Sequence, residues 1–518
     1  MNLNLANITA EMLGVAKQAL SNPLKQDSNL SFAKSITTGT GLVAYDLQAP
    51  AKNLYPTMTP IRNKMPRIGG KGGTATNWRQ VNQILGSGYG AMPWVPEGQR
   101  SARMSYNTST VSASYVTIGE EDEISFEAIN AAKNFEDERA MMTMRLLQRA
   151  MMKEEMAILA GNKSVALGTP ATAVLSASGA TGTLPAATYS VICVALTMEG
   201  YLNIFYTGGS LPYTPASVVA VTVPTSQTVT GADGNTFVLN GGSSNKSTSA
   251  VQAVTLGQIL FASVTQVVGA VAYCWFVGVA GSETLQFITS INSVAVSTAL
   301  AGGRQAATTV TADSSRNANY AFDGLFSTAV NSGTAIVTTQ ATGTAGTGTP
   351  LTASGSGSIN EFDNLCKSMW DNYRVSPSVF YVNSQEILNI KNKVLGNAGS
   401  PLVRFVMDDA GSATQNVTAG AIVGTYFNPF TLEGGRVIPI RIHPFVPAGT
   451  VLGYAEDLPA QYQSNNVPNV AELHVRAEYE EIEWPIRTRQ REHGVYCEEV
   501  LAVYAPFAMG IVTNIGNG

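Results

Sequence analysis

The sequence predicts an α+β fold in which an all-β module interrupts a larger body of helices and strands. Of its 518 residues, 45% are hydrophobic, 13% are charged and 49 are glycine, which is too apolar for disorder and too rich in turn formers for a helical bundle. Charge almost vanishes over residues 166–305, where short strands rich in Val, Ala, Thr and Ser alternate with turns. Helical patterns lie on both sides of this stretch.

The first part of the chain predicts an N-terminal arm, residues 1–52, in which residues 9–20 have the spacing of a short amphipathic helix. The first residues lack the basic start and long apolar core that are typical of a signal peptide.

Residues 53–118 predict an extended β-hairpin loop. Three prolines and the Gly-rich stretch at 69–73 exclude a regular core there, and strand-like pieces follow at 75–85 and 111–118. We expect the Gly-rich stretch to form the hairpin tip. Since a lone hairpin is poorly stable, Trp78 and Trp94 are expected to pack on another molecule.

Residues 119–165 predict a peripheral domain with a long spine helix over 125–160 that has Ser125 as its N-cap and a break near 130–134. The apolar side chains at helical spacing indicate an ordinary core stripe rather than a partner groove. They are Met144, Leu147, Met151 and Ile158.

Residues 166–305 predict an inserted β-sandwich with strands that include 188–197, 216–223 and 269–280, and a hairpin turn at 198–203. The ends of a sandwich lie close together, so this module is expected to be removable. The uncharged run Ile259–Gly281 has the length of a membrane helix, but Gln266 interrupts it and its second half alternates, which favours a buried strand.

Residues 306–460 predict an axial α/β domain, and residues 461–518 predict strands that return to the peripheral and axial domains. The Gly/Ser/Thr tract 331–358 is expected to be a loop. Ser358 and Glu361 have the spacing of a capping box for a helix. Strands are expected at 379–382, 436–442 and 449–455.

The charge and the cysteines narrow the function. The net charge of −5 disfavours a dedicated nucleic-acid binder, which would carry a basic excess. The four cysteines lie far apart and are expected to be reduced buried thiols, although a Cys193–Cys274 disulfide is conceivable.

No catalytic motif is legible, so we expect neither an enzyme nor a cofactor. His443, His474 and His493 lack metal-ligand spacing, and GGKGG lacks the P-loop frame. The acidic residues of 478–483 stand near three arginines, a pattern that is compatible with a metal site but favours ion pairs between strands or subunits.

The order of these elements resembles the Hong Kong 97-type major capsid proteins of tailed phages. The best-matching pieces are YPTMTPIRNKMPRI, WVPEGQR, SVFYVNSQEILNIKNKV and HGVYCEEVLAVYAPFAMGIV. The resemblance covers about 1–165 and 306–518, and it depends on element order more than on any single motif. Residues 166–305 depart from the basic subunit and are similar to an immunoglobulin-like insertion.

This resemblance implies a subunit that self-assembles as hexamers and pentamers into an icosahedral shell around double-stranded DNA, in the virion, after assembly in the host cytoplasm. It implies a separate scaffolding protein, a portal and possible decoration proteins, and no membrane. Neighbours of this family interlock through the loop, the arm and the spine. The residues expected at contacts between subunits are Lys71, Trp78, Arg79, Trp94, Glu97, Arg100, Arg487, Arg489 and Arg491.

Some members of the family cross-link a loop lysine to a neighbour, and Lys71 is the one match here, although a solvated loop lysine is the simpler interpretation. Three other functions stay open. They are an encapsulin-like protein compartment, a virion adhesin that uses the β-sandwich, and an enzyme with an unrecognised site.

Overall fold

The computed structural model describes residues 58–69, 72–85, 94–101, 103–132, 137–205, 221–354, 357–396, 424–432, 434–459, 462–463 and 468–517. Contacts divide the chain into the units Met1–Pro56 and Thr57–Gly518, and every described residue belongs to the second. The predicted arm and Lys71 therefore lie outside the described residues.

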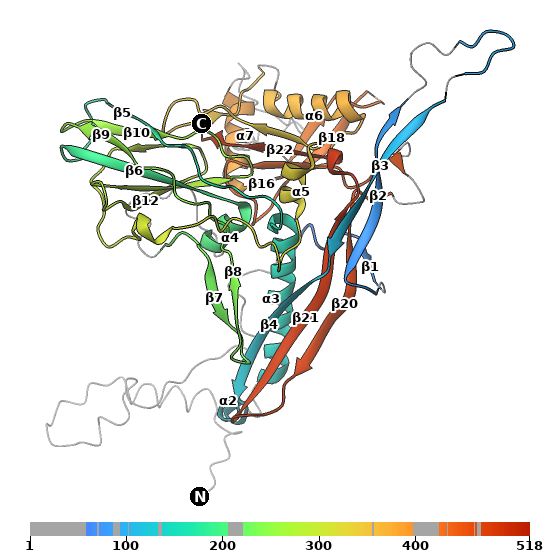
Figure 1. The fold of residues 1–518 in the computed structure, drawn as a ribbon, viewed down its shortest axis with the longest axis horizontal. Coiled ribbons are helices and arrows are strands. Elements are labelled where there is room, and N and C mark those ends of the chain that lie inside the picture. The colour runs from blue at the N-terminus through green and yellow to red at the C-terminus, as the bar shows by residue number, and fades with distance from the viewer. Residues whose placement is uncertain are drawn as a thin grey trace, which may run out of the picture. The chain divides into compact units, whose positions relative to one another are not determined.

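A long sheet and a long helix form one end of this unit (Figure 1). The sheet has the order β1-β20-β21-β4, with β1 parallel to β20 and the other pairs antiparallel. Its strands are β1 (Arg67–Ile68), β4 (Val116–Ser125), β20 (Ala471–Glu483) and β21 (Gln490–Val503). Met142, Leu146 and Ala150 of the helix form a cluster with Val495 of the sheet, which holds the helix against it.

The break expected near 130–134 in the spine helix is present, whereas the apolar stripe differs from its prediction. There are two helices, α2 (Phe126–Ala132) and α3 (Glu138–Ala160), and Asp137 caps the second by accepting from the amides of residues 139 and 140. The predicted stripe is wrong for Met144 and Leu147, which are 44% and 39% exposed. The buried face instead includes two glutamates, which hydropathy alone assigns to solvent.

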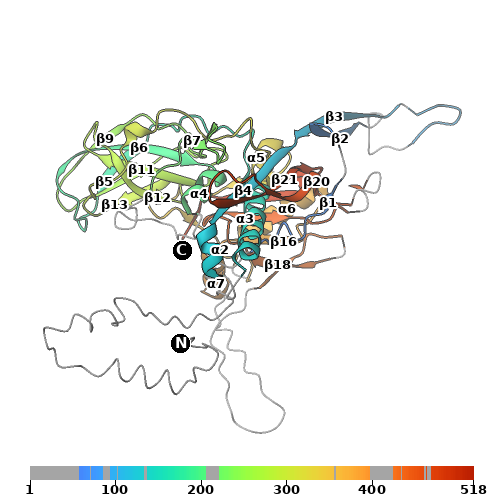
Figure 2. The same cartoon turned by 90° about the horizontal axis from the view of Figure 1, so that it is seen from below.

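The predicted hairpin is present, but its tip was misplaced. Strands β2 (Ala75–Leu85) and β3 (Ser105–Ser114) form a two-stranded antiparallel sheet, in which Ala75 pairs with Ser114 at one end and Leu85 with Ser105 at the other. The end of β2 that follows the Gly-rich stretch is therefore the root of the hairpin, and its far end is where Leu85 pairs with Ser105. Figures 1 and 2 show the two strands leaving the rest of the unit.

The all-β module contains two antiparallel sheets, of the orders β12-β11-β6-β9 and β13-β10-β5, and a separate hairpin β7-β8. Trp275 and Cys193 belong to the cluster shared by the two sheets. The strands are β5 (Val174–Ser178), β6 (Ala187–Leu196), β7 (Gln227–Thr230), β8 (Thr236–Leu239), β9 (Ala250–Val254), β10 (Ile259–Ser263), β11 (Ala272–Gly278), β12 (Thr284–Thr289) and β13 (Ser293–Val296).

Three local predictions in the module need comment. The hairpin turn predicted at 198–203 is wrong, because helix α4 (Met198–Phe205) stands there. The strand predicted at 216–223 is not found in residues 221–223, and the rest lies outside the described residues. The apolar run at 259–281 forms β10 and β11, and none of the described helices is long and apolar enough to cross a membrane.

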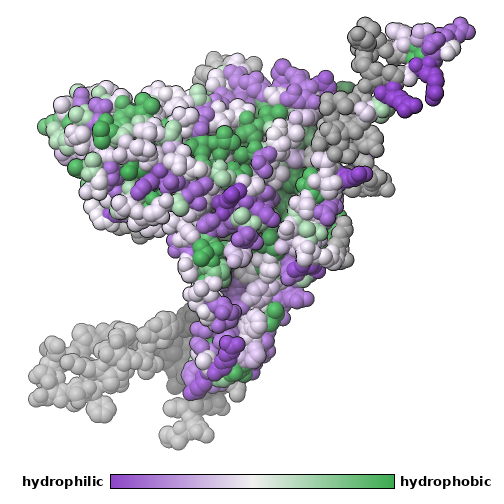
Figure 3. Space-filling model, viewed as in Figure 1, coloured by the Kyte–Doolittle hydropathy of each residue, from purple (hydrophilic) through white to green (hydrophobic). Residues whose placement is uncertain are grey.

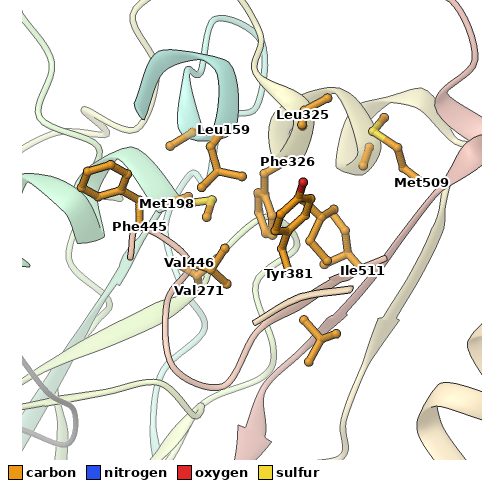
Figure 4. Packing of buried hydrophobic residues seen from close by; sticks show 14 of the residues in the cluster. Leu159, Met198, Val271, Leu325, Phe326, Tyr381, Phe445, Val446, Met509 and Ile511 are labelled. Atoms are coloured by element: carbon orange, nitrogen blue, oxygen red, sulfur yellow. The ribbon is translucent and has the colours of Figure 1, made fainter. Parts of the chain in front are cut away.

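Strands β6, β11 and β12 of the module are buried on both faces over most of their length. Val194 and Phe276 point away from the second sheet and belong to the large core of the rest of the unit. Figure 4 shows how close this packing is, with Met198 and Val271 of the module near Leu159 of α3. The module therefore shares a core with the rest of the unit.

The remaining part is built on a six-stranded mixed sheet of order β14-β22-β19-β16-β18-β17, with a small β15-β23 pair beside it. Its strands are β14 (Ile336–Thr339), β15 (Thr349–Pro350), β16 (Val379–Val382), β17 (Thr425–Asn428), β18 (Arg436–Ile442), β19 (Val451–Tyr454), β22 (Met509–Thr513) and β23 (Ile515–Gly516). The helices are α5 (Leu325–Ser332), α6 (Asn360–Tyr373), α7 (Ser384–Gly396), and the 3₁₀ turns η3 (Ala307–Thr309) and η5 (Pro506–Ala508).

Two predictions for this part are wrong. The Gly/Ser/Thr tract supplies β14, which pairs in parallel with β22. The capping box is absent, because Ser358 donates to Asp363 (2.7 Å) and Glu361 accepts from the amide of Thr352 (2.9 Å). The four cysteines are buried and free, so the conceivable Cys193–Cys274 bond is not formed.

Candidate assembly interface

The root of the hairpin is attached to the long sheet by a buried polar chain. The Thr76 hydroxyl lies 2.8 Å from Nδ1 of His474, and Nε2 of His474 lies 2.9 Å from the hydroxyl of Tyr504. Tyr504 then donates to Glu472 at 2.9 Å. Trp78 of β2 adds an edge-to-face contact with the Tyr504 ring at 5.7 Å. These contacts set where the hairpin leaves the body.

The segment that precedes the hairpin is held by Glu155 on the buried face of α3. Its carboxylate accepts from the amides of Ile61 (2.9 Å) and Arg62 (2.7 Å). It also bonds Nε2 of His443 at 2.6 Å. Because Nδ1 of His443 accepts from the amide of Phe445 (3.2 Å), Nε2 carries the proton in a neutral ring. One carboxylate thus ties this segment to both the helix and the six-stranded sheet.

Glu154, the neighbouring residue on α3, binds the side chains of the same segment. It pairs with Nε of Arg62 at 2.5 Å and with Arg67. Tyr479 of β20 donates to the same carboxylate. Glu154 is fully buried, and an ion pair with two guanidiniums offsets the cost of burying its charge.

The far end of the hairpin contrasts with its root. Trp94 is 86% exposed and Met104 is 66% exposed. Glu97 and Arg100 are exposed as well. Figure 3 shows hydrophilic residues around this end. A large indole that is left in water on a two-stranded arm indicates a contact surface for another molecule.

The face of the long sheet that points away from α3 is acidic. Val495 and Glu120 form a register pair on the α3 side, since Val495 packs on α3 and Glu120 pairs with Lys153 of that helix. Strand alternation therefore places the neighbouring pairs on the opposite face. The carboxylates of this acidic face are those of Glu121, Glu123, Glu480 and Glu492.

The C-terminal arginines lie at the end of these strands that is distant from the hairpin root. Arg489 pairs with Glu127 at 2.8 Å, and Arg491 pairs with Glu483. Ion pairs, which the sequence favoured over a metal site, therefore form within the chain. Arg487 is exposed. Across the part of the chain that the structure describes, no group of three or more His, Cys, Asp or Glu residues is placed to hold a metal ion.

The predicted contact residues thus fall into two groups. Trp78 is half-buried at the root, Arg79 is exposed on β2, and Trp94, Glu97 and Arg100 lie toward the far end. The arginines of 487–491 follow the end of β20, which lies nine residues or about 30 Å from His474 at the root.

Sequence reasoning missed the glutamate pair at 154–155 and the role of His474. The available signal was the placement of two adjacent glutamates within an otherwise apolar helix face.

No protein-family model matches the chain, and no curated protein matches it either. Among solved structures, the capsid of the native GTA particle aligns with 95% of this chain and 100% of its own, at 9% identity and a TM-score of 0.40. The capsid of Myoviridae phage XM1 aligns with 92% of this chain and 100% of its own, at 8% identity and a TM-score of 0.37. The holo-SrpI encapsulin complex from Synechococcus elongatus aligns with 37% of this chain and 56% of its own, at 16% identity and a TM-score of 0.22. The solved chains that align with most of this one are thus capsid proteins of tailed-phage type.

Proposed function

We propose that this chain is a major capsid protein that self-assembles into an icosahedral shell around viral double-stranded DNA. The observation that carries the proposal is the β2–β3 hairpin, which is fixed at its root by buried contacts and exposes Trp94 beyond strands that pair only with each other among the described residues. Such an arm is costly in an isolated subunit and useful in an assembly, where a neighbour covers it. The role is architectural, without catalysis.

A second copy of the chain is the partner that the charges favour. The described part of the hairpin and its loop carries Arg79, Arg100 and Arg103 against one acid, Glu97. The acidic face of the long sheet in a neighbouring copy carries the opposite charge and can receive this basic hairpin. Complementary potentials of this kind steer association and set the register of a contact. Repeated around closed symmetry, such contacts produce a shell.

The enclosed DNA would be contained rather than gripped. The net charge of −5 supplies no phosphate-neutralising excess. Scaffolding protein, portal and decoration protein are further partners of the proposed shell.

The test is negative-stain electron microscopy of the purified chain, with and without a co-expressed scaffolding protein. Closed icosahedral particles are expected, and folded monomers under all assembly conditions would contradict the proposal. Trp94→Ser and Arg100→Glu should each reduce particle yield at least tenfold and leave the thermal unfolding of the subunit unchanged. Val174→Ser, a control at a site 72% exposed on the module, should assemble normally.

Charge reversal tests the contact itself. Arg100→Glu combined with Glu492→Lys should recover particles that either single variant loses, because the attraction is restored with opposite signs. If no charge-reversed double variant on the acidic face restores particles, the hairpin contacts a different surface of the neighbouring copy. Particles filled with a protein cargo instead of DNA would favour a compartment shell, and glycan binding by unassembled chains would favour an adhesin.

A further inference from the structure

A tyrosine ring lies flat on the acidic face of the long sheet. Tyr496 pairs with Glu480 of β20 on one side and with Gly119 of β4 on the other, so its side chain belongs to that face. A Cβ at Gly494 would stand 2.6 Å from Cε2 of Tyr496, and one at Gly119 would meet the same ring. Because the ring covers two glycines, one of its faces lies against the sheet. Tyr496 is only half-buried, so the outer face of the ring is open to a partner.

Carboxylates surround this ring. Glu121 accepts a hydrogen bond from the Tyr496 hydroxyl. Glu480 is the register partner of the tyrosine, and Glu492 stands on the same face of β21. Burial first, and then the hydrogen bond and charge of Glu121 and the charge of Asp233, raise the pKa of the Tyr496 hydroxyl. The ring is therefore the floor of a surface with negative potential, which favours a cation.

Elsewhere on this sheet, a tyrosine beside a carboxylate holds an arginine. The guanidinium carbon of Arg476 lies 5.6 Å from the centroid of the Tyr115 ring, and Nε of the same arginine pairs with Glu498 at 2.5 Å. A guanidinium group is planar and weakly hydrated, so it can stack on a ring while its N–H groups bond to carboxylates at the edge of the ring. Tyr496 and its carboxylates offer the same combination of groups.

We propose, on the basis of the function proposed above, that Tyr496 is the platform on which Arg100 of a neighbouring copy stacks. Arg100 is exposed and directly follows a turn in which the amide of Gln99 donates to the carbonyl oxygen of Pro96 at 3.1 Å. The turn presents the arginine at the far end of the hairpin, whereas Arg79 lies on β2 nearer to the root.

The platform gives the hairpin contact a defined register. Ion pairs between exposed side chains contribute little, and carboxylates spread along a strand would let a basic hairpin bind at several positions. A single flat ring among them singles out one position, and it discriminates between arginine and lysine because only the planar guanidinium can stack and pair at once. Tyr496 is thus the residue that sets where the hairpin lies on the acidic face.

The experiment is a double-mutant cycle on the lowest concentration at which the full chain assembles, measured by light scattering and electron microscopy. Arg100→Ala and Tyr496→Leu should each raise this concentration about tenfold, and the double variant should raise it no further. Tyr496→Phe keeps the ring face and should stay within about twofold of wild type. Tyr320→Leu, the same change at a ring 51% exposed, is the control and should assemble normally. Additive effects of the two single variants, or coupling of Tyr496 to Arg79 or Arg103 instead, would overturn the assignment.

Arg100→Lys tests the stacking without altering the sheet. It keeps the charge at an exposed position and should still raise the assembly concentration about threefold. Assembly equal to that of wild type would rule out a stacked guanidinium, even if Tyr496→Leu fails to fold.

A disulfide between copies reports on the contact with or without closed particles. Chains with Arg100→Cys, mixed with chains that carry Glu480→Cys, should form a mixed disulfide under mild oxidation, and the four native cysteines are buried and should not compete. Val174→Cys, at an exposed site on the module, should give none in place of Glu480→Cys. A disulfide without particles would contradict the shell but not the contact. Particles that give neither the disulfide nor the coupling would contradict the contact alone.

Discussion

The ring of Tyr496 lies against the backbone of Gly119, its partner across the β4–β21 ladder. A Cβ at Gly119 would stand 2.2 Å from Cδ1 of Tyr496. The ring cannot swing aside freely, because its hydroxyl is bonded to Glu121. An aromatic ring that covers a cross-strand glycine in this way fixes the register of two strands.

Gly119→Ala should therefore lower the free energy of unfolding by about 1–3 kcal/mol, the usual cost of overpacking. The measurement is urea denaturation followed by circular dichroism. Gly302→Ala is the control, since nothing lies within 4 Å of its added Cβ. Equal free energies of unfolding for the two variants would show that the Tyr496 ring can move aside to accommodate the added methyl group.

Asn514 joins the six-stranded sheet to the module and holds a left-handed backbone, with φ of +62°. Its side chain accepts from the amide of Asn292 (2.8 Å) and donates to the Asn292 carbonyl oxygen Oδ1 (3.1 Å) and to the backbone oxygen of Gln340 (2.7 Å). Asn514→Ala should cost about 2–4 kcal/mol, because it combines lost hydrogen bonds with backbone strain. Asn514→Gly should cost less, because glycine tolerates the backbone angle. The reverse order of melting temperatures would refute this account.

Tyr504→Phe should loosen the hairpin root. The change keeps the ring against Trp78 but removes the hydroxyl that links His474 to Glu472. A loss of about 1–3 kcal/mol is expected, since buried polar groups are left without partners. Hydrogen exchange at residues 75–79 should accelerate. Tyr320→Phe, at a ring 51% exposed, serves as the control and should change neither quantity.

Glu386 should make stability fall with rising pH. Burial raises the pKa of this carboxyl from 4.5 to about 7, although it accepts from the amide of Gly449 at 2.8 Å. A raised pKa means that its contribution is complete below pH 4.5 and is lost as the pH rises through 7. Glu386→Gln should flatten this part of the stability profile, by about 3 kcal/mol at most. A Glu386→Gln profile parallel to that of wild type between pH 5 and 8 would contradict the assignment.

Removal of residues 166–305 with a short Gly-Ser replacement should yield an aggregated chain. The deletion takes away Met198 and Val271 and leaves Leu159 and Phe326 exposed to water. Size-exclusion chromatography and circular dichroism provide the measurement. A soluble product with a cooperative melt would restore the expectation of a freely removable insert.

The sequence anticipated those elements whose cause is local. The apolar run Val379–Val382 between turn formers became β16 at those residues, and the helix expected after Ser358 became α6. The strands expected at 436–442 and 449–455 likewise formed as β18 and β19.

The misses arise from contacts between distant parts of the chain. β14 forms because β22 offers a free edge 174 residues later, and no local pattern in a Gly/Ser/Thr tract reports this partner. The buried face of α3 was misread because Glu154 and Glu155 meet arginines and amides from 87 to 94 residues away. For the candidate interface, the aromatic and charged residues of the hairpin loop could be picked out from the sequence. The hydrogen bonds of His474 with Thr76 and Tyr504 could not, because they join distant parts of the chain.

A ribbon of two strands has no third strand to steady it, so its direction is decided at one end. For β2, with 11 residues, the span is about 35 Å, and a turn of about 10° at the root would carry the far end through roughly 6 Å. The hairpin therefore acts as a lever arm whose fulcrum is the small group of side chains around His474 and Tyr504. Mutations of these root residues should therefore shift the position of Trp94 relative to a neighbouring subunit, although they change no residue that Trp94 contacts.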